Sequence, residues 1–249
     1  MNCVLMFTGW GGRIMGAKPS HIQEALSSRD CKVHIFNDTK KKLFLHGADG
    51  YRGTKKLQEH LQDIVLESSY TVALTSSGGG YAGIRYCIDA GVDCIVGFSV
   101  FTTADEAARA ADPRGRKAIP IVDSVLPTDE EKNLRFFLQK KDARTKIHLY
   151  FPKKSQPDVY QSRNLRGLPG VTLHPQVGSK HLMHDTGQSV FNFLDEVAVI
   201  EKIPFLMDLA TDAPAAVAAE ASADDETEIN EAAEAEVGEA AEAEQKQEA

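Results

Sequence analysis

The sequence has little cysteine, and its four cysteines (Cys3, Cys31, Cys87 and Cys94) lie far apart. No two of them are spaced as C-x-x-C, so neither a thioredoxin-like redox motif nor a paired-cysteine zinc site is indicated. Three of the four fall in or beside apolar segments of strand or helix type. The pattern predicts reduced, buried thiols in a cytoplasmic protein.

The sequence also lacks a long apolar run. No segment approaches the ~20 apolar residues that a membrane-spanning helix needs, and the first residues, MNCVLMFTG, lack the basic start of a signal peptide. Basic runs are short: residues 40–42 and 153–154 lie near expected turns and are interpreted as solvated surface. We therefore expect neither a membrane span nor nucleic-acid binding.

Aromatic side chains are missing from residues 210–249, which are rich in Ala and Glu. Residues 209–249 carry 13 Asp and Glu against one Lys, a charge of −12, so the overall −8 leaves +4 on residues 1–208. Such a segment buries too little apolar surface to offset the entropy lost on ordering. We predict one folded domain at 1–208 and a disordered acidic tail at 209–249, with a protein partner for the tail as the functional alternative.

Short apolar segments alternate with amphipathic segments through residues 1–208. The apolar segments predict strands at 3–8, 32–36, 71–74, 94–98, 146–151 and 171–174. The amphipathic segments predict helices at 21–26, 54–67, 81–90, 130–138, 159–165 and 189–197. This alternation predicts an α/β fold, a mostly parallel sheet with helices on both faces. Residues 101–127 are less regular and are expected to form an excursion or lid at the carboxyl edge of the sheet, where such folds place their sites.

Residues 71–83, TVALTSSGGGYAG, join an apolar strand directly to a helix. The nucleophile elbow G-x-S-x-G places a serine at such a turn, and here the frame is Thr75-x-Ser77-x-Gly79, with threonine at the first glycine. Ser77 is the candidate nucleophile. Two alternatives remain: Gly78-x-Gly80-x-x-Gly83 has the form of a dinucleotide fingerprint, although no acid ends the next strand, and the glycines could serve only a tight turn.

A nucleophilic serine needs a base, and the base needs a group that orients it. In α/β hydrolases these residues follow the order Ser, Asp or Glu, His. Asp158 follows the last strand but one and His181 follows the last strand, so both are candidates. Alternatively, Asp158 is only the N-cap of the next helix, and Asp123 is the second candidate for the acid.

His181 is one of three nearby histidines, with His174 and His184. His181-x-x-His184, together with His174 or Asp185, is an alternative metal site, but its spacing matches no strong zinc signature. The position of His181 after the last strand, behind Gly178, favours a general base.

The first strand ends in a glycine-rich loop, Gly9-Trp10-Gly11-Gly12. Hydrolases of this class stabilise the oxyanion with the amide after the nucleophile and with one from a loop after an early strand. The backbone N–H groups of Gly78 and Trp10 are the candidates. Alternatively, the loop is a turn in which Trp10 covers the core.

Taken in order, these motifs resemble a branch of the α/β-hydrolase superfamily associated with bacterial polysaccharide and glycosyltransferase loci. The matching residues lie between about 3 and 200: Phe7-Thr-Gly9, Asn37-Asp38, Gly79-Gly-Tyr-Ala82, Phe98-Ser99, Asp158 and Gly178-Ser-Lys-His181. Thr75 departs from the branch's elbow glycine.

The resemblance implies ester or acyl chemistry on a small or glycan-linked substrate, by an esterase or an acyltransferase. It implies that Ser77 attacks the carbonyl, that His181 takes its proton and that Asp158 holds the imidazole, without a metal or organic cofactor. A catalytically degenerate binding protein with the same fold is the non-enzymatic alternative.

Overall fold

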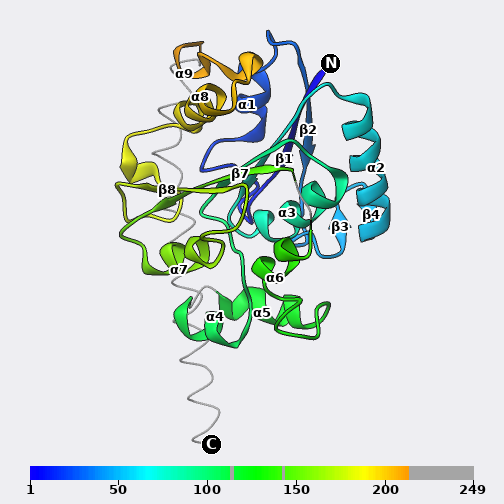
Figure 1. Cartoon of the computed structure of the whole chain (residues 1–249), viewed down its shortest axis with the longest axis vertical. Coiled ribbons are helices and arrows are strands. Elements are labelled where there is room, and N and C mark those ends of the chain that lie inside the picture. The colour runs from blue at the N-terminus through cyan, green and yellow to red at the C-terminus, as the bar shows by residue number, and fades with distance from the viewer. Residues whose placement is uncertain (113–114, 142–143, 213–249) are drawn as a thin grey trace, which may run out of the picture. The chain divides into compact units, whose positions relative to one another are not determined.

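The computed structural model describes residues 1–112, 115–141 and 144–212 (Figure 1). Six strands form one sheet in the order β2-β1-β5-β6-β7-β8, and every neighbouring pair is parallel. The strands are β1 (Asn2–Phe7), β2 (Cys31–Phe36), β5 (Thr71–Ser76), β6 (Cys94–Phe98), β7 (Lys146–Pro152) and β8 (Val171–Gln176). All six predicted strands are present, so the predicted α/β fold with a parallel sheet is confirmed.

Helices cover both faces of this sheet. The helices of the described residues are α1 (Pro19–Ala25), α2 (Thr54–Glu67), α3 (Gly79–Ala90), α4 (Glu106–Ala111), α5 (Gly115–Asp123), α6 (Leu134–Gln139), α7 (Gln156–Asn164), α8 (Val190–Glu201) and α9 (Leu209–Asp212). Figure 1 shows α1 and α8 together on one side of the sheet, and α3 and α7 on the other. None of the helices in the described part of the chain is long and apolar enough to cross a membrane.

The central strands are buried on both sides, which explains their continuous apolar sequences. In β1, Cys3, Leu5 and Phe7 belong to the hydrophobic cluster that also contains residues of α2 and α3. Val4 and Met6 are equally buried but lie outside that cluster. Since successive strand residues point to opposite faces, both faces of β1 are covered.

Residues 101–127 contain more regular structure than the sequence indicated, since they include α4 and α5. Asp105 caps α4 by accepting a hydrogen bond from the amide of Ala108. A two-stranded hairpin of β3 (Gly47–Ala48) and β4 (Tyr51–Arg52) was also not predicted. Helix α6 begins later than predicted, because Asn133 is its N-cap and accepts from the amide of Arg135.

The predicted domain boundary after residue 208 falls just before α9. Leu209 is fully buried, and the amides of Leu209 and Ala210 donate to Asp195 at 2.7 and 2.9 Å. The described fold therefore continues to residue 212. The rest of the predicted disordered tail, residues 213–249, lies outside the described residues and stays a prediction.

Candidate active site

Ser77 occupies a sharp turn between β5 and α3. Its φ is 51°, in the left-handed region that L-residues with a side chain seldom adopt. Three backbone hydrogen bonds hold it there. Ser77 N–H donates to the Phe98 carbonyl at 2.9 Å, and the Ser77 carbonyl accepts from the amides of Phe101 and Gly80 at 3.1 and 3.2 Å. A backbone conformation of this kind costs about 1–3 kcal/mol of stability, and it persists only where contacts with the surrounding structure hold it in place. The turn has the geometry of a nucleophile elbow.

The glycines after Ser77 allow α3 to start against neighbouring backbone. A Cβ on Gly79 would lie 2.1 Å from the carbonyl oxygen of Thr8, and a Cβ on Gly80 would lie 2.4 Å from a methyl group of Val100. Both glycines are buried against protein atoms. The alternative of a dinucleotide loop gains no support from this packing, because that loop presents its glycine backbone to a pyrophosphate.

Thr75 fits the elbow because a glycine faces it. Thr75 on β5 pairs in register with Gly97 on β6, and a Cβ on Gly97 would lie 3.2 Å from Thr75 Oγ1. The usual first glycine of the elbow leaves room because it has no side chain. Here Gly97 on the neighbouring strand has no side chain, and this leaves room for Thr75. The Thr75 hydroxyl is buried and has no hydrogen-bond partner.

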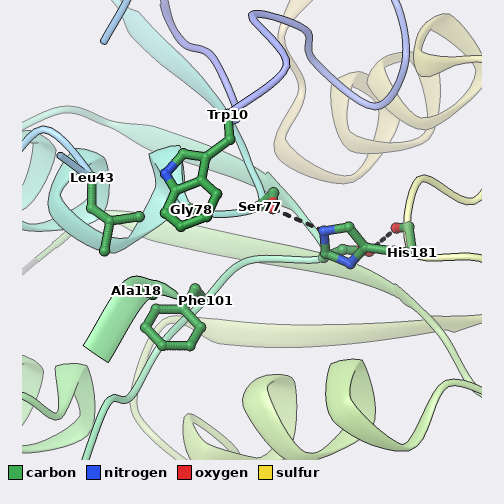
Figure 2. Close-up of a pocket in the computed structure, with 8 residues that line it drawn as sticks. Trp10, Leu43, Ser77, Gly78, Phe101, Ala118 and His181 are labelled. Carbon is green, nitrogen blue, oxygen red and sulfur yellow. Dashed lines mark hydrogen bonds between the residues drawn. The ribbon is translucent and has the colours of Figure 1, made fainter. Parts of the chain in front are cut away.

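His181 lies within hydrogen-bond reach of both Ser77 and Asp158. Ser77 Oγ is 2.8 Å from His181 Nε2, and His181 Nδ1 is 2.8 Å from Asp158 Oδ1 (Figure 2). An ionised carboxylate only accepts hydrogen bonds, so Nδ1 carries the imidazole proton and Nε2 is left to accept from the serine hydroxyl. This is the arrangement of a nucleophile, a base and the group that orients the base.

Asp158 is fully buried and lies in the first turn of α7. The N-cap of that helix is Ser155, whose hydroxyl donates to Asp158 Oδ2 at 2.6 Å. Asp158 is therefore not the N-cap, and both of its carboxylate oxygens have partners. The second candidate acid, Asp123, instead pairs with Lys132 and Arg109, both at 2.7 Å. The hydrogen bond from Lys132 is the main reason that the pKa of Asp123 lies below its usual value.

Ser99 is a further site residue whose role the sequence did not reveal. It follows β6, is buried, and has a φ of 48°, so the site contains a second left-handed serine. Its hydroxyl donates to the backbone carbonyl of His181 at 2.5 Å. In the sequence, Ser99 is noticeable only as part of the pair Phe98-Ser99 in the family resemblance, and that pair does not indicate a role for its hydroxyl.

The two candidate oxyanion donors follow neighbouring strands, Trp10 after β1 and Gly78 after β5. Within the described residues, neither the Gly78 nor the Trp10 amide has a backbone acceptor. The Trp10 ring lies against Gly78, because a Cβ on Gly78 would be 3.2 Å from Trp10 Nε1 (Figure 2). Trp10 therefore borders the site through its side chain as well.

A small cavity of about 70 Å³ opens beside the Ser77 hydroxyl. Apolar side chains form most of its wall: Trp10, Leu43, Phe101 and Ala118. Figure 2 shows Trp10 and Phe101 on opposite sides of this space, with His181 at one end. Ala118 comes from α5, so the segment expected to be a lid contributes to the cavity wall.

Of the residues considered for a metal site, the His184 side chain lies outside the described part of the structure, and His174 and Asp185 have other partners. Among the described side chains, no group of three or more His, Cys, Asp or Glu residues is placed to hold a metal ion. His174 lies 3.0 Å from His148 instead, and Asp185 accepts hydrogen bonds from Ser179. The four cysteines are free thiols, and three of them are buried as predicted, whereas Cys31 is only partly buried. Burial raises the pKa of Cys3 to about 11.

The fold is that of the α/β hydrolases. Two solved structures show the likeness: an α/β-hydrolase enzyme from the metagenome of lagoon sediments at Mar Chica, Morocco, and an inhibited esterase B from Lactobacillus rhamnosis. The first has a TM-score of 0.54 and 14% identity over 81% of this chain and 92% of its own. The second has a TM-score of 0.53 and 14% identity over 83% of this chain and 77% of its own. No protein-family model and no curated protein matches the sequence.

Proposed function

We propose that the protein is a serine esterase that hydrolyses small carboxylic esters. The observation that carries this proposal is the hydrogen-bonded chain from Ser77 through His181 to Asp158, with 2.8 Å at both steps. A serine is a poor nucleophile unless a positioned base removes its proton. The left-handed turn at Ser77 adds to the proposal, because it exposes the hydroxyl at the carboxyl edge of the sheet.

In the proposed reaction, Ser77 Oγ attacks the ester carbonyl while His181 Nε2 takes its proton. Asp158 holds the imidazole in the required tautomer and stabilises the imidazolium that forms. The amides of Gly78 and Trp10 would stabilise the oxyanion, a contribution of about 2.7–4 kcal/mol per donor in comparable enzymes. His181 then protonates the departing alcohol, and water releases the acid from Ser77.

The cavity beside Ser77 favours a short, apolar acyl group. The cavity is small, at about 70 Å³, and most of its wall is apolar. We therefore expect butyrate esters to be better substrates than octanoate esters. Acyl transfer to an alcohol would use the same residues, and the glycan-linked substrate suggested by the resemblance stays a prediction.

A fluorophosphonate probe and 4-nitrophenyl esters test the proposal together. The wild type should be labelled and should hydrolyse 4-nitrophenyl butyrate, and Ser77→Ala should lose both properties. Ser76→Ala is the matched control, since it removes the neighbouring serine hydroxyl. Labelling that survives in Ser77→Ala, or no labelling of the wild type, would contradict the proposal. Product analysis with an added alcohol distinguishes hydrolysis from acyl transfer.

A further inference from the structure

A second cavity, of about 380 Å³, lies on the loop that connects β2 to α2. Four basic side chains line it: Lys40, Lys42, His46 and Arg52. They come from the turn after β2, from the segment before β3 and from β4. The sequence alone indicated solvated surface for the lysines, and the tertiary fold places them with a histidine and an arginine around one space.

None of these four side chains makes an ion pair or hydrogen bond with another residue in the described part of the chain. The two carboxylates that also line the cavity have partners within the loop. Asp38 accepts from the Phe44 amide at 2.9 Å, and Asp49 accepts from the amide and hydroxyl of Thr39 at 3.2 and 3.0 Å. The positive groups are therefore left to interact with a ligand, whereas the negative groups already hold the backbone.

The loop that carries the lysines is fixed in a strained conformation. Lys41, Leu43 and Phe44 have φ values of 53°, 57° and 58°, all in the left-handed region. Each such residue costs about 1 kcal/mol or more. The buried hydroxyl of Tyr86 donates to the Phe44 carbonyl at 2.8 Å, and Asp38 holds the Phe44 amide. Strain that is anchored in this way typically occurs at functional sites.

One loop contributes to both the basic cavity and the candidate active site. Lys42 lines the basic cavity, and the following residue, Leu43, lines the cavity beside Ser77. The loop follows β2, and β2 is separated from β5 by β1 alone, so the carboxyl ends of β2 and β5 are two strand spacings apart, roughly 10 Å. This shared loop is the observation that links the basic cavity to the reaction at Ser77.

We propose that the basic cavity binds a phosphate group on the alcohol part of the ester substrate. This proposal rests on the esterase function proposed above. Three positive charges outnumber the two carboxylates of the lining, and a histidine adds a further donor. This balance suits a phosphate group, whose oxygens accept several charge-assisted hydrogen bonds. When Ser77 attacks, the carbonyl carbon bonds to Oγ and the ester C–O bond breaks. The phosphorylated alcohol leaves with the proton that His181 took from Ser77, and water then frees the acid.

Calorimetric titration with inorganic phosphate, at constant ionic strength, tests the site directly. The loop variant Lys40→Ala/Lys42→Ala/Arg52→Ala removes three exposed charges. Its matched control, Lys140→Ala/Lys141→Ala/Lys146→Ala, removes three exposed charges elsewhere. We expect saturable binding to the wild type and the control, and a Kd at least tenfold higher for the loop variant. Equal Kd values in all three proteins, or no saturable binding, would overturn the site.

Two matched esters, butyrylglycerol and butyrylglycerol phosphate, test the link to the reaction. In the wild type, kcat/KM should be at least tenfold higher for the phosphate ester, and the loop variant should lose that preference while it keeps its rate on the neutral ester. Phosphate binding without this preference would overturn the assignment to the substrate. Ser77→Ala separates the two proposals, because it should bind phosphate like the wild type and hydrolyse neither ester. If it bound phosphate and still hydrolysed the esters, the proposed esterase function would be wrong and the phosphate site would be supported.

Discussion

Replacement of Ser99 separates activity from stability, because its hydroxyl and its backbone act differently. The hydroxyl donates to the His181 carbonyl at 2.5 Å and so fixes the loop that presents the base. The backbone, at a φ of 48°, is strained for any residue except glycine. Ser99→Ala removes the hydroxyl and keeps the strain, whereas Ser99→Gly removes both.

The two variants should have equal losses of activity and different stabilities. A buried neutral hydrogen bond contributes about 0.5–1.5 kcal/mol. If its loss misplaces the base and raises the activation free energy by as much, each ~1.36 kcal/mol lowers the rate tenfold. We therefore expect kcat to fall by about 3- to 10-fold in both variants, with KM nearly unchanged. Relief of the left-handed strain should leave Ser99→Gly about 1 kcal/mol more stable than Ser99→Ala.

Steady-state hydrolysis of 4-nitrophenyl butyrate and urea unfolding measure the two effects. The rate of labelling by a fluorophosphonate should fall in parallel with kcat, because it depends on the same base. If Ser99→Gly kept wild-type kcat, or if kcat followed stability across the two variants, Ser99 would act only in folding and the positioning role would be refuted.

Three further results are expected from other parts of the molecule. Asp158→Asn should lower kcat by about 10³-fold or more, because the imidazole is no longer held in the required tautomer, while Asp123→Asn should leave kcat within twofold. A large loss in Asp123→Asn and a small one in Asp158→Asn would show that Asp123 is the acid that orients the base. Thr75→Val should raise the free energy of unfolding by about 1 kcal/mol, because it replaces a buried hydroxyl that has no partner; a lower midpoint in urea would contradict this. Removing residues 213–249 should change stability by less than about 0.5 kcal/mol, whereas removing residues 209–249 should cost about 2 kcal/mol or more because α9 contains a fully buried leucine. Equal urea midpoints for both truncations would show that α9 contributes nothing.

The strands and most of the helices could be predicted because their signals are local. Continuous apolar segments such as residues 94–98 mark strands buried on both faces, and the stripe of Leu57, Leu61 and Ile64 marks a helix with one buried side. The helices at 106–111 and 115–123 were missed because they are short. Their stability comes from caps and from packing, which leave little periodicity in the sequence.

The candidate site was predicted from the order of its residues along the chain, since carboxyl ends of parallel strands meet at one edge of the sheet. That argument placed Ser77, Asp158 and His181 at the same edge but gave no distances. It also left Asp158 and Asp123 as rivals, because a carboxylate after a proline reads equally well as a helix cap. Only the fold showed that Ser155 holds the N-cap position of α7 and that Asp158 faces His181.

The fold class, the strand-to-helix turn at Ser77 and the order of the site residues follow from patterns in the sequence. The pairing of Thr75 with Gly97, the contact of Ser99 with the His181 carbonyl, and the gathering of four basic side chains around one cavity emerge only when the chain is folded. The difference lies in the range of the contacts. Hydrophobic period and turn chemistry act over a few residues, whereas Ser99 and His181 are 82 residues apart and meet only when β6 and the loop after β8 reach the same edge of the sheet.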